Sequence, residues 1–316
     1  MSEQAPKERV DLRILGPTPN WTMMGTLISL GLFEGGELPA GSTAGAVRTS
    51  DPASAPALVD QQVYDMSFAK GTSTLGMAIA GLGPFLSPLD LRALAVVPMD
   101  DRLVLMVKRD LGVSTLAELL ETRGEITIAA PDPAGTHPVV AFIEQLLRVH
   151  GASWNELRSR GWDVDSSRPG SWPADELPDV VLDGAIMSPR WKPIFHSGAY
   201  RPISVSAEGR EALEVVGHRF ATLPTTYVTD MSNDEASIEH IDIAGWPLFC
   251  HRSTPDWLAH ATVDALARKV QEIFDMTDEA IEEPFDLSLG GLTGGVPLHP
   301  GAKAWYEQNE YETDDE

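Results

Sequence analysis

The sequence predicts an α/β protein with two similar lobes. A strand, a polar loop and a helix follow one another near the N-terminus, and the same order recurs near the middle of the chain. About fifty residues after each of these strands comes a short apolar segment that contains Asp and is followed by a polar turn: VYDMSFA (63–69) and PDVVLDGAIM (178–187). Strand–helix–strand units of this kind build sheets that are covered by helices. Two copies therefore predict two α/β lobes.

The elements of each unit follow from local patterns. DLRIL (11–15) predicts the first strand, GPTPN a loop, and WTMMGTLISLGLF (21–33) the first helix. EITIA (125–129) predicts the matching strand in the second half, and the Pro- and Gly-rich loop APDPAGTHP (130–138) follows it. In the next segment apolar residues recur at helical spacing until Gly151, which predicts a second amphipathic helix.

The connection between the halves is predicted from two apolar runs, LRALAVVP (91–98) and RLVLMVKRD (102–110), which flank the turn MDD. We expect these runs to carry the chain from the first lobe into the second. RPISVS (201–206) is expected to begin the return, and WPLFCHRS (246–253) with the helix after it to rejoin the first lobe. The predicted domains are residues 1–105 for the first part of lobe 1, 106–205 for lobe 2, and 206–316 for the return to lobe 1 with C-terminal helices.

Composition excludes several classes of function. The chain has 23 basic and 47 acidic residues, a formal net charge of −24, which argues against nucleic acid and anionic membrane surfaces as partners. No apolar run approaches the ~20 residues that span a bilayer, so no membrane insertion is expected. The N-terminus lacks a secretory signal pattern. As written, the chain is expected in the cytoplasm; it would be extracytoplasmic if a leader or the true start is missing.

Metal and cofactor motifs are absent from the sequence. The single cysteine, Cys250, excludes an internal disulfide and a thiolate cluster, and its apolar surroundings predict a buried thiol. The histidines show no metal-ligand spacing, and no nucleotide-binding glycine pattern occurs. We expect neither a metal nor a cofactor.

Candidate binding residues follow the predicted strands, because ligands of α/β sheets bind where strand ends meet helix starts. The candidates are Thr18, Asn20, Trp21, Thr22, Lys70, Thr72, Ser73, Asp132, Gly135, Thr136, His137, Arg190 and Trp191. Lys70 or Arg190 could pair with a carboxylate, and the indole of Trp191 could form an apolar wall. The alternatives are a helix cap for Thr18, a solvated surface position for Lys70 and a structural ion pair for Arg190.

His137 has three interpretations at this stage. At the start of the second predicted helix it could donate to an anion, act as an acid or base, or bond to the backbone. The sequence leaves these open.

The C-terminal run VPLHPGAKAWYEQ (296–308) resembles the ending of the TAXI family, the TRAP-associated extracytoplasmic solute-binding proteins. Leu298, His299, Pro300, Gly301 and Ala302 match the family's closing segment, and the aromatic pair Trp305 and Tyr306 follows it. At lower specificity the resemblance extends over roughly residues 11–308 and includes Asp65 in the first pocket strand and the Gly135–Thr136 pair.

This resemblance implies a two-lobed, periplasmic-binding-protein-like fold of type 2 that traps a small organic anion, a carboxylate, between its lobes. If the protein is exported, TRAP permease subunits are the implied partners. Three features depart from the family: the first helix begins with GPTPNWTMM instead of a glycine-rich turn, Lys70 replaces a neutral residue, and no export signal is visible. The alternative function is a cytoplasmic enzyme on the same fold, such as a decarboxylase of an aromatic or dicarboxylic acid, with His137 and Lys70 as catalytic residues.

Overall fold

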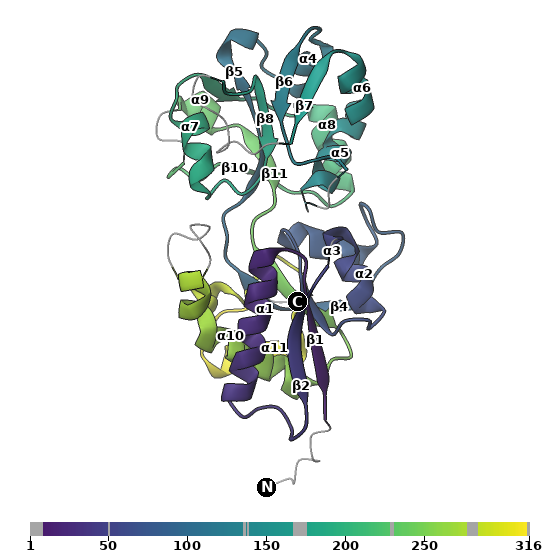
Figure 1. The fold of residues 1–316 in the computed structure, drawn as a ribbon, viewed down its shortest axis with the longest axis vertical. Helices are drawn as coiled ribbons and strands as arrows, with labels where there is room; N and C mark the ends of the chain where they lie inside the picture. The colour runs from purple at the N-terminus through teal and green to yellow at the C-terminus, as the bar shows by residue number, and fades with distance from the viewer. Residues whose placement is uncertain are drawn as a thin grey trace.

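The structure is a computed structural model that describes residues 9–49, 51–134, 137, 139–166, 176–227, 231–276 and 284–314. Two α/β lobes lie one above the other and are joined by two extended segments (Figure 1). Each lobe has its own sheet with helices packed against it. The predicted two-lobed α/β architecture is confirmed.

The first lobe contains a five-stranded sheet in the order β2–β1–β3–β12–β4. Its strands are β1 (Asp11–Gly16), β2 (Thr43–Arg48), β3 (Met66–Phe68), β4 (Leu91–Val97) and β12 (Trp246–His251). Its helical segments are α1 (Pro19–Glu34), η1 (Pro52–Ser54), α2 (Ala55–Asp60), α3 (Thr72–Ala80), α10 (Asp256–Met276), η5 (Leu287–Leu289) and α11 (Pro300–Gln308). The strands β1, β2 and β3 are parallel, whereas β12 runs antiparallel to β3 and β4.

The second lobe contains a seven-stranded sheet in the order β10–β11–β5–β8–β6–β7, with β9 also paired to β5. Its strands are β5 (Arg102–Lys108), β6 (Ile126–Ala129), β7 (Trp162–Asp165), β8 (Val180–Asp183), β9 (Tyr200–Pro202), β10 (Phe220–Thr222) and β11 (Glu239–Asp242). Its helical segments are η2 (Arg109–Leu111), α4 (Leu116–Glu121), α5 (Val140–Val149), α6 (Trp154–Ser159), η4 (Pro189–Trp191), α7 (Lys192–Phe195), α8 (Ala207–Val215) and α9 (Asn233–Ala236).

The predicted domain boundaries at 105 and 205 need correction. The first strand of the second sheet begins at Arg102, and its last strand ends at Asp242. The RPISVS segment does not begin the return, because β9 pairs antiparallel with β5 in the same sheet. Strand β11 pairs with the start of β5, with Leu103 opposite Ile241, so it extends the second sheet before the chain crosses back.

Strand β5 is the central strand of the second lobe, and both of its faces are buried. Leu103, Leu105 and Val107 contribute to one hydrophobic cluster, and Val104 and Met106 contribute to another. This division follows from the two-residue period of a strand, whose successive side chains point to opposite faces. An apolar run with no polar alternation therefore becomes a strand that is covered on both sides.

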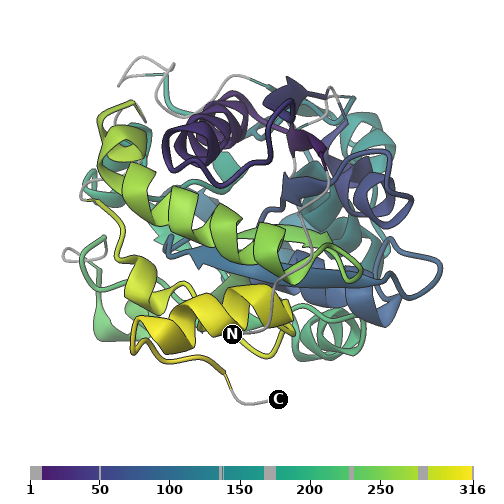
Figure 2. The same ribbon diagram turned by 90° about the horizontal axis from the view of Figure 1, so that it is seen from below.

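The C-terminal LHPGA segment has a structural role. His299 caps α11 by accepting a hydrogen bond from the Gly301 amide, and Pro300 occupies the first turn, where an amide hydrogen is not needed. A Cβ on Gly301 would lie 2.1 Å from the carbonyl oxygen of Asp256. Only glycine therefore allows α11 to pack beside α10 across the underside of the first lobe (Figure 2).

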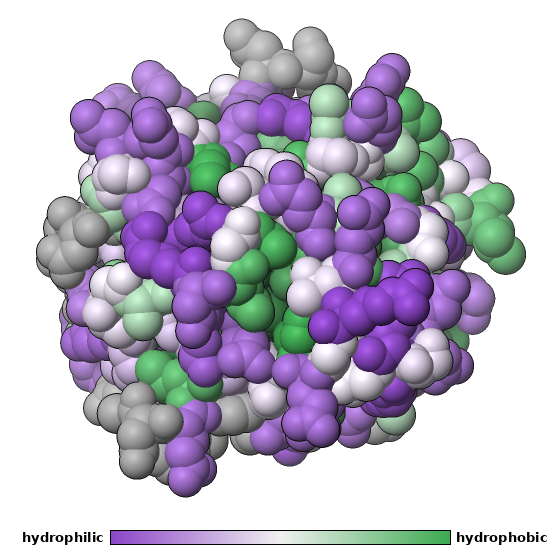
Figure 3. Space-filling view, turned by 90° about the horizontal axis from the view of Figure 1, so that it is seen from above, coloured by the Kyte–Doolittle hydropathy of each residue, from purple (hydrophilic) through white to green (hydrophobic). Residues whose placement is uncertain are grey.

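The single cysteine lies in the core of the first lobe. Cys250 is fully buried, as predicted, and burial raises the pKa of its thiol to about 12. The end of the second lobe presents a largely hydrophilic surface on which hydrophobic residues form small separate areas (Figure 3). Within the described residues, no helix is long and apolar enough to span a bilayer, and no group of side chains has the make-up of a metal site.

Candidate ligand-binding site between the lobes

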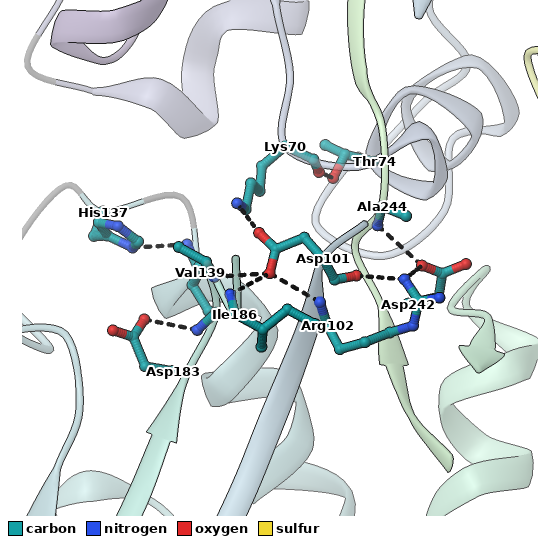
Figure 4. A network of polar contacts seen from close by, with 12 residues as sticks. Lys70, Thr74, Asp101, Arg102, His137, Val139, Asp183, Ile186, Asp242 and Ala244 are labelled. Atoms are coloured by element: carbon teal, nitrogen blue, oxygen red, sulfur yellow. Dashed lines mark hydrogen bonds and ion pairs between the residues drawn. The ribbon is translucent and has the colours of Figure 1, made fainter. Parts of the chain in front are cut away.

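The two lobes meet at a buried ion pair between Lys70 and Asp101 (Figure 4). Lys70 follows β3 in the first lobe and is 8% exposed, while Asp101 lies in the first crossover and is fully buried. One oxygen of the Asp101 carboxylate accepts a hydrogen bond from the Lys70 ammonium. The other accepts from the amides of Arg102 at 2.8 Å and Ala185 at 2.7 Å. One carboxylate thus connects the first lobe, the crossover and the loop after β8.

A second ion pair ties the returning crossover to the first. Arg102 Nη1 donates to Asp242 Oδ1 at 3.0 Å and to the carbonyl oxygen of Asp101 at 2.8 Å. The crossovers also bond directly, because the Ile243 amide donates to the Asp101 carbonyl at 3.2 Å and the Gly245 amide to that of Met99 at 2.8 Å. The hinge between the lobes therefore consists of two crossovers that are joined by backbone hydrogen bonds and by the Arg102–Asp242 ion pair.

A pocket of about 50 Å³ lies between the lobes beside this hinge, and we call it the inner pocket. Nine lining residues come from the first lobe: Trp21, Ala53, Pro56, Ala69, Lys70, Thr74, Met77, Pro84 and Phe85. Three come from α5 of the second lobe: Ala141, Phe142 and Gln145. The starts of α1, α3 and α5 all contribute, which is the arrangement expected for a ligand site of α/β lobes.

Besides Thr74 and Gln145, which bond within the chain, this mostly apolar lining includes the Trp21 indole and the Lys70 ammonium. The Trp21 indole is 2% exposed, and its Nε1 has no hydrogen-bond partner within the described chain. Its ring stacks on Phe68 with centroids 6.2 Å apart and meets Trp246 edge-on at 5.7 Å. The Lys70 ammonium lies 5.6 Å from the centroid of the same Trp246 ring. The indole and the ammonium therefore both line the inner pocket and both pack against Trp246.

A buried histidine, which does not itself line the inner pocket, packs against two second-lobe residues of the lining. His218 is 3% exposed, bonds through Nε2 to the Gln145 side chain and meets Phe142 edge-on with centroids 5.4 Å apart. Burial lowers the pKa of His218 to about 4. Its imidazole is therefore neutral at pH 7, and it adds no positive charge to the pocket.

The residues predicted around the first helix divide into two groups. Trp21 lines the inner pocket, whereas the threonines start the helix: Thr18 Oγ1 accepts from the Trp21 amide at 3.3 Å, and Thr22 Oγ1 donates to the carbonyl of Gly16 at 2.9 Å. The capping alternative for Thr18 is therefore the observed one. Asn20 is a partly buried residue in the first turn of α1 and does not line the inner pocket.

Of the three residues predicted after β3, one lines the inner pocket and two do not. Lys70 lines the inner pocket and is buried, so the alternative of a solvated surface lysine is wrong. Thr72 begins α3, and its amide donates to the carbonyl of Ala244 at 3.1 Å. Ser73 Oγ donates to the carbonyl of Asp242 at 3.3 Å. These two residues contact the returning crossover rather than the pocket.

The loop before α5 is described in part. Asp132 is exposed, and its carboxylate accepts from the Ala134 amide at 2.9 Å, which closes a local turn. His137 is partly buried, and its Nδ1 accepts from the Val139 amide at 3.3 Å (Figure 4). A backbone bond was one of the three interpretations of His137. Gly135 and Thr136 lie outside the described residues.

Arg190 and Trp191 belong to the interior of the second lobe. Arg190 Nη2 donates to Asp183 Oδ2 at 2.9 Å and to the carbonyl of Gly184 at 3.0 Å, which is the structural ion pair considered as the alternative. Trp191 is 1% exposed, donates to the same carbonyl at 3.0 Å and stacks on Phe195 with centroids 5.1 Å apart. Neither residue lines the inner pocket, so the geometry gives Arg190 no role as a carboxylate clamp.

Several residues of the site were not predicted from the sequence. Asp101 was interpreted only as part of the turn MDD, although an acid between two apolar strands is a signal for a buried, paired charge. Met77, Phe85, Phe142 and Gln145 carried a helical or apolar pattern that a hydrophobic core explains equally well. No local pattern separates a pocket wall from a core residue.

Comparisons with known proteins give only distant matches. No protein-family model matches the sequence, and no curated protein matches it. Among solved structures, XAC2383 from Xanthomonas citri bound to ATP has 11% identity and a TM-score of 0.49, with 95% of each chain covered. MatC from Rhodopseudomonas palustris with bound malate has 15% identity and a TM-score of 0.47, with 85% of this chain and 86% of that chain covered.

A third similar structure is the periplasmic aliphatic sulphonate binding protein SsuA from Escherichia coli. It has 14% identity and a TM-score of 0.40, with 95% of this chain and 79% of that chain covered. At such scores these likenesses identify no ligand for this chain. The TAXI resemblance stays a prediction.

Replacing one partner of the buried Lys70–Asp101 pair should destabilise the protein much more than replacing both. Asp101→Asn keeps an acceptor for the Ala185 amide but leaves the Lys70 ammonium buried without a counter-charge. We expect it to lower the free energy of unfolding in urea by about 3 kcal/mol or more. Lys70→Met combined with Asp101→Asn should recover most of that loss.

The control is the half-buried pair Lys108–Asp179 in the second lobe, whose nitrogen and oxygen are 3.0 Å apart. Because solvent screens it, Asp179→Asn should cost less than about 1 kcal/mol. Equal losses at the two sites, or no recovery in the double variant, would show that the Lys70–Asp101 pair does not hold the hinge.

His218 predicts a pH dependence of stability. An unfolded histidine titrates near pH 6.5, whereas folded His218 stays neutral down to about pH 4. Its contribution to stability is therefore present above pH 6.5 and is lost as the pH falls toward 4. Between pH 7 and pH 5 the loss from this group should be on the order of 2 kcal/mol, measured by urea unfolding.

His218→Asn should reduce this pH dependence, and His260→Asn, at a partly exposed histidine bonded to Gln308, should leave it unchanged. An identical pH profile for wild type and His218→Asn would contradict the assignment.

Proposed function

We propose that the protein binds a small organic anion, a carboxylate with an apolar body, in the inner pocket between its lobes. The observation that carries the proposal is the buried Trp21 Nε1, which has no partner in the described chain and belongs to a pocket that Lys70 also lines. A buried donor without an acceptor costs free energy, which a ligand oxygen can restore. An ammonium has three N–H donors, so Lys70 can bond Asp101 and a ligand oxygen at once.

The apolar lining favours a ligand whose body is hydrocarbon. Met77, Phe85 and Phe142 line the inner pocket beside Trp21, and the histidine behind them is neutral. A volume of about 50 Å³ holds only a few water-sized groups, so a larger acid enters only when the lobes separate. Movement about the two crossovers would open the pocket, and closure would bury the ligand.

A transport role follows as a further part of the proposal and rests on the TAXI resemblance. Under it, the bound acid is delivered to TRAP permease subunits when the protein lies outside the cytoplasm. Capture between the lobes needs no catalytic residue, and Lys70, which the enzyme alternative uses as a catalyst, bonds Asp101 at the hinge.

The proposal predicts selectivity for an acid over its neutral analogue. In a thermal-shift screen of small organic acids and their amides, acids should raise the melting temperature and the matched amides should not. For an acid that binds, Trp21→Phe removes the indole donor and keeps a smaller aromatic ring, so the dissociation constant should rise about fivefold. Lys70→Met/Asp101→Asn, which leaves no unpaired charge, should raise it tenfold or more.

Trp162→Phe serves as the control, because Trp162 is a buried tryptophan of β7 that does not line the inner pocket. Binding that is unaffected by both pocket variants would overturn the site. Conversion of the acid during incubation would favour the decarboxylase alternative instead, and recovery of unchanged acid supports binding.

A further inference from the structure

A second and larger pocket lies against α5 and α6 of the second lobe, and Gly83 and Pro84 of the first lobe also line it. Its volume is about 600 Å³, and we call it the outer pocket. Pro84, Ala141 and Gln145 line both pockets, so the outer pocket adjoins the inner one. Its volume lies within the range of sites for small molecules, roughly 300–1,000 Å³, which the inner pocket does not reach.

Two arginines give the outer pocket a local positive charge. Arg148 lies in the last turn of α5 and Arg158 in the last turn of α6, and both side chains are exposed and line the pocket. Within the described residues neither has an ion-pair partner, and Glu144 is the only acid in the lining. The lining therefore carries two positive charges against one negative charge, in a protein whose net charge is −24.

Arg148 and Arg158 are among the eight of sixteen described arginines for which no ion pair is found. The other eight bond carboxylates. These include Arg102 with Asp242, Arg109 with Glu235, Arg190 with Asp183, Arg210 with Glu214, Arg252 with Asp90 and Arg268 with Glu37. Two unpaired guanidinium groups on one pocket wall are free to bond the same anion from outside the chain.

A buried indole supplies an independent observation at the same place. Trp154 begins α6, lines the outer pocket and is 6% exposed. Its Nε1 is buried and has no hydrogen-bond partner in the part of the chain that the structure describes. A guanidinium and an indole N–H only donate, so a ligand that binds to all three must supply the acceptors.

We propose that the outer pocket is a second binding site, for an oxyanion carried on a small apolar molecule. Arg148 and Arg158 bond the oxyanion, which is a carboxylate or a phosphate, because a guanidinium matches the geometry of both. Pro84, Pro133 and Leu147 contact the apolar body of the ligand. This site is separate from the carboxylate site of the inner pocket and does not depend on it.

The test measures binding of phenyl phosphate and benzoate to the full chain by titration calorimetry, with the Trp indole signals of a ¹⁵N-labelled sample reporting the place of binding. Arg148→Gln and Arg158→Gln should each raise the dissociation constant about tenfold, and Trp154→Phe a few-fold. The matched controls are Arg48→Gln, an exposed arginine in β2, and Trp162→Phe, both of which should bind as the wild type does.

The stronger of the two probes identifies the oxyanion. Lys70→Met/Asp101→Asn removes the inner site and should leave the outer affinity unchanged. The proposal is overturned if neither probe binds, if the arginine variants bind both probes like the wild type, or if Arg48→Gln weakens binding equally. A loss of all probe binding in the inner-pocket variant would overturn it as well, since the probes would then occupy the inner pocket alone.

Discussion

The fully buried carboxylate of Asp101 is the constraint on which the arrangement of the two lobes depends. Removing a carboxylate from water is costly unless its oxygens are all used, and here they are used by the Lys70 ammonium and by backbone amides from two segments. These partners belong to the first lobe, the crossover and the second lobe. The cost of burying the charge is therefore offset only when all three segments are in place.

The same network places the proposed ligand donors. The bond to Asp101 fixes the lysine at the end of β3, and the Trp246 ring beneath the ammonium also packs against Trp21. Hinge and pocket thus share one side chain. Under the proposed function, a ligand oxygen bonded to Lys70 would share the ammonium with Asp101, which would couple binding to the crossover.

Much of the fold could be predicted from the sequence, because it rests on local periodicity. The strand and helix of each half and the apolar run of β5 follow from spacing and from residues of restricted conformation. The placement of β9, β10 and β11 could not be predicted, since these short strands are held by pairing with β5 and carry no distinct pattern of their own. The predicted return to the first lobe was early for that reason.

Residues of the site could be predicted from the sequence only where they follow the end of a strand. Trp21 and Lys70 follow strand ends, and both line the inner pocket. Arg190 also follows a strand end, but an acid seven residues earlier, Asp183, pairs with it in the interior. Tertiary packing determines which basic side chain pairs with a buried carboxylate. Neither the Arg190–Asp183 pair nor the Lys70–Asp101 pair could therefore be predicted from a single sequence.

The most direct measurement is a crystal structure of the protein grown with a saturating acid from the thermal-shift screen. The acid should lie between the lobes, with a carboxylate oxygen about 3 Å from Trp21 Nε1 and from Lys70 Nζ, and with its apolar part against Phe85 and Phe142. An acid bound elsewhere, while Trp21 Nε1 still lacks an acceptor, would contradict the account of the inner pocket.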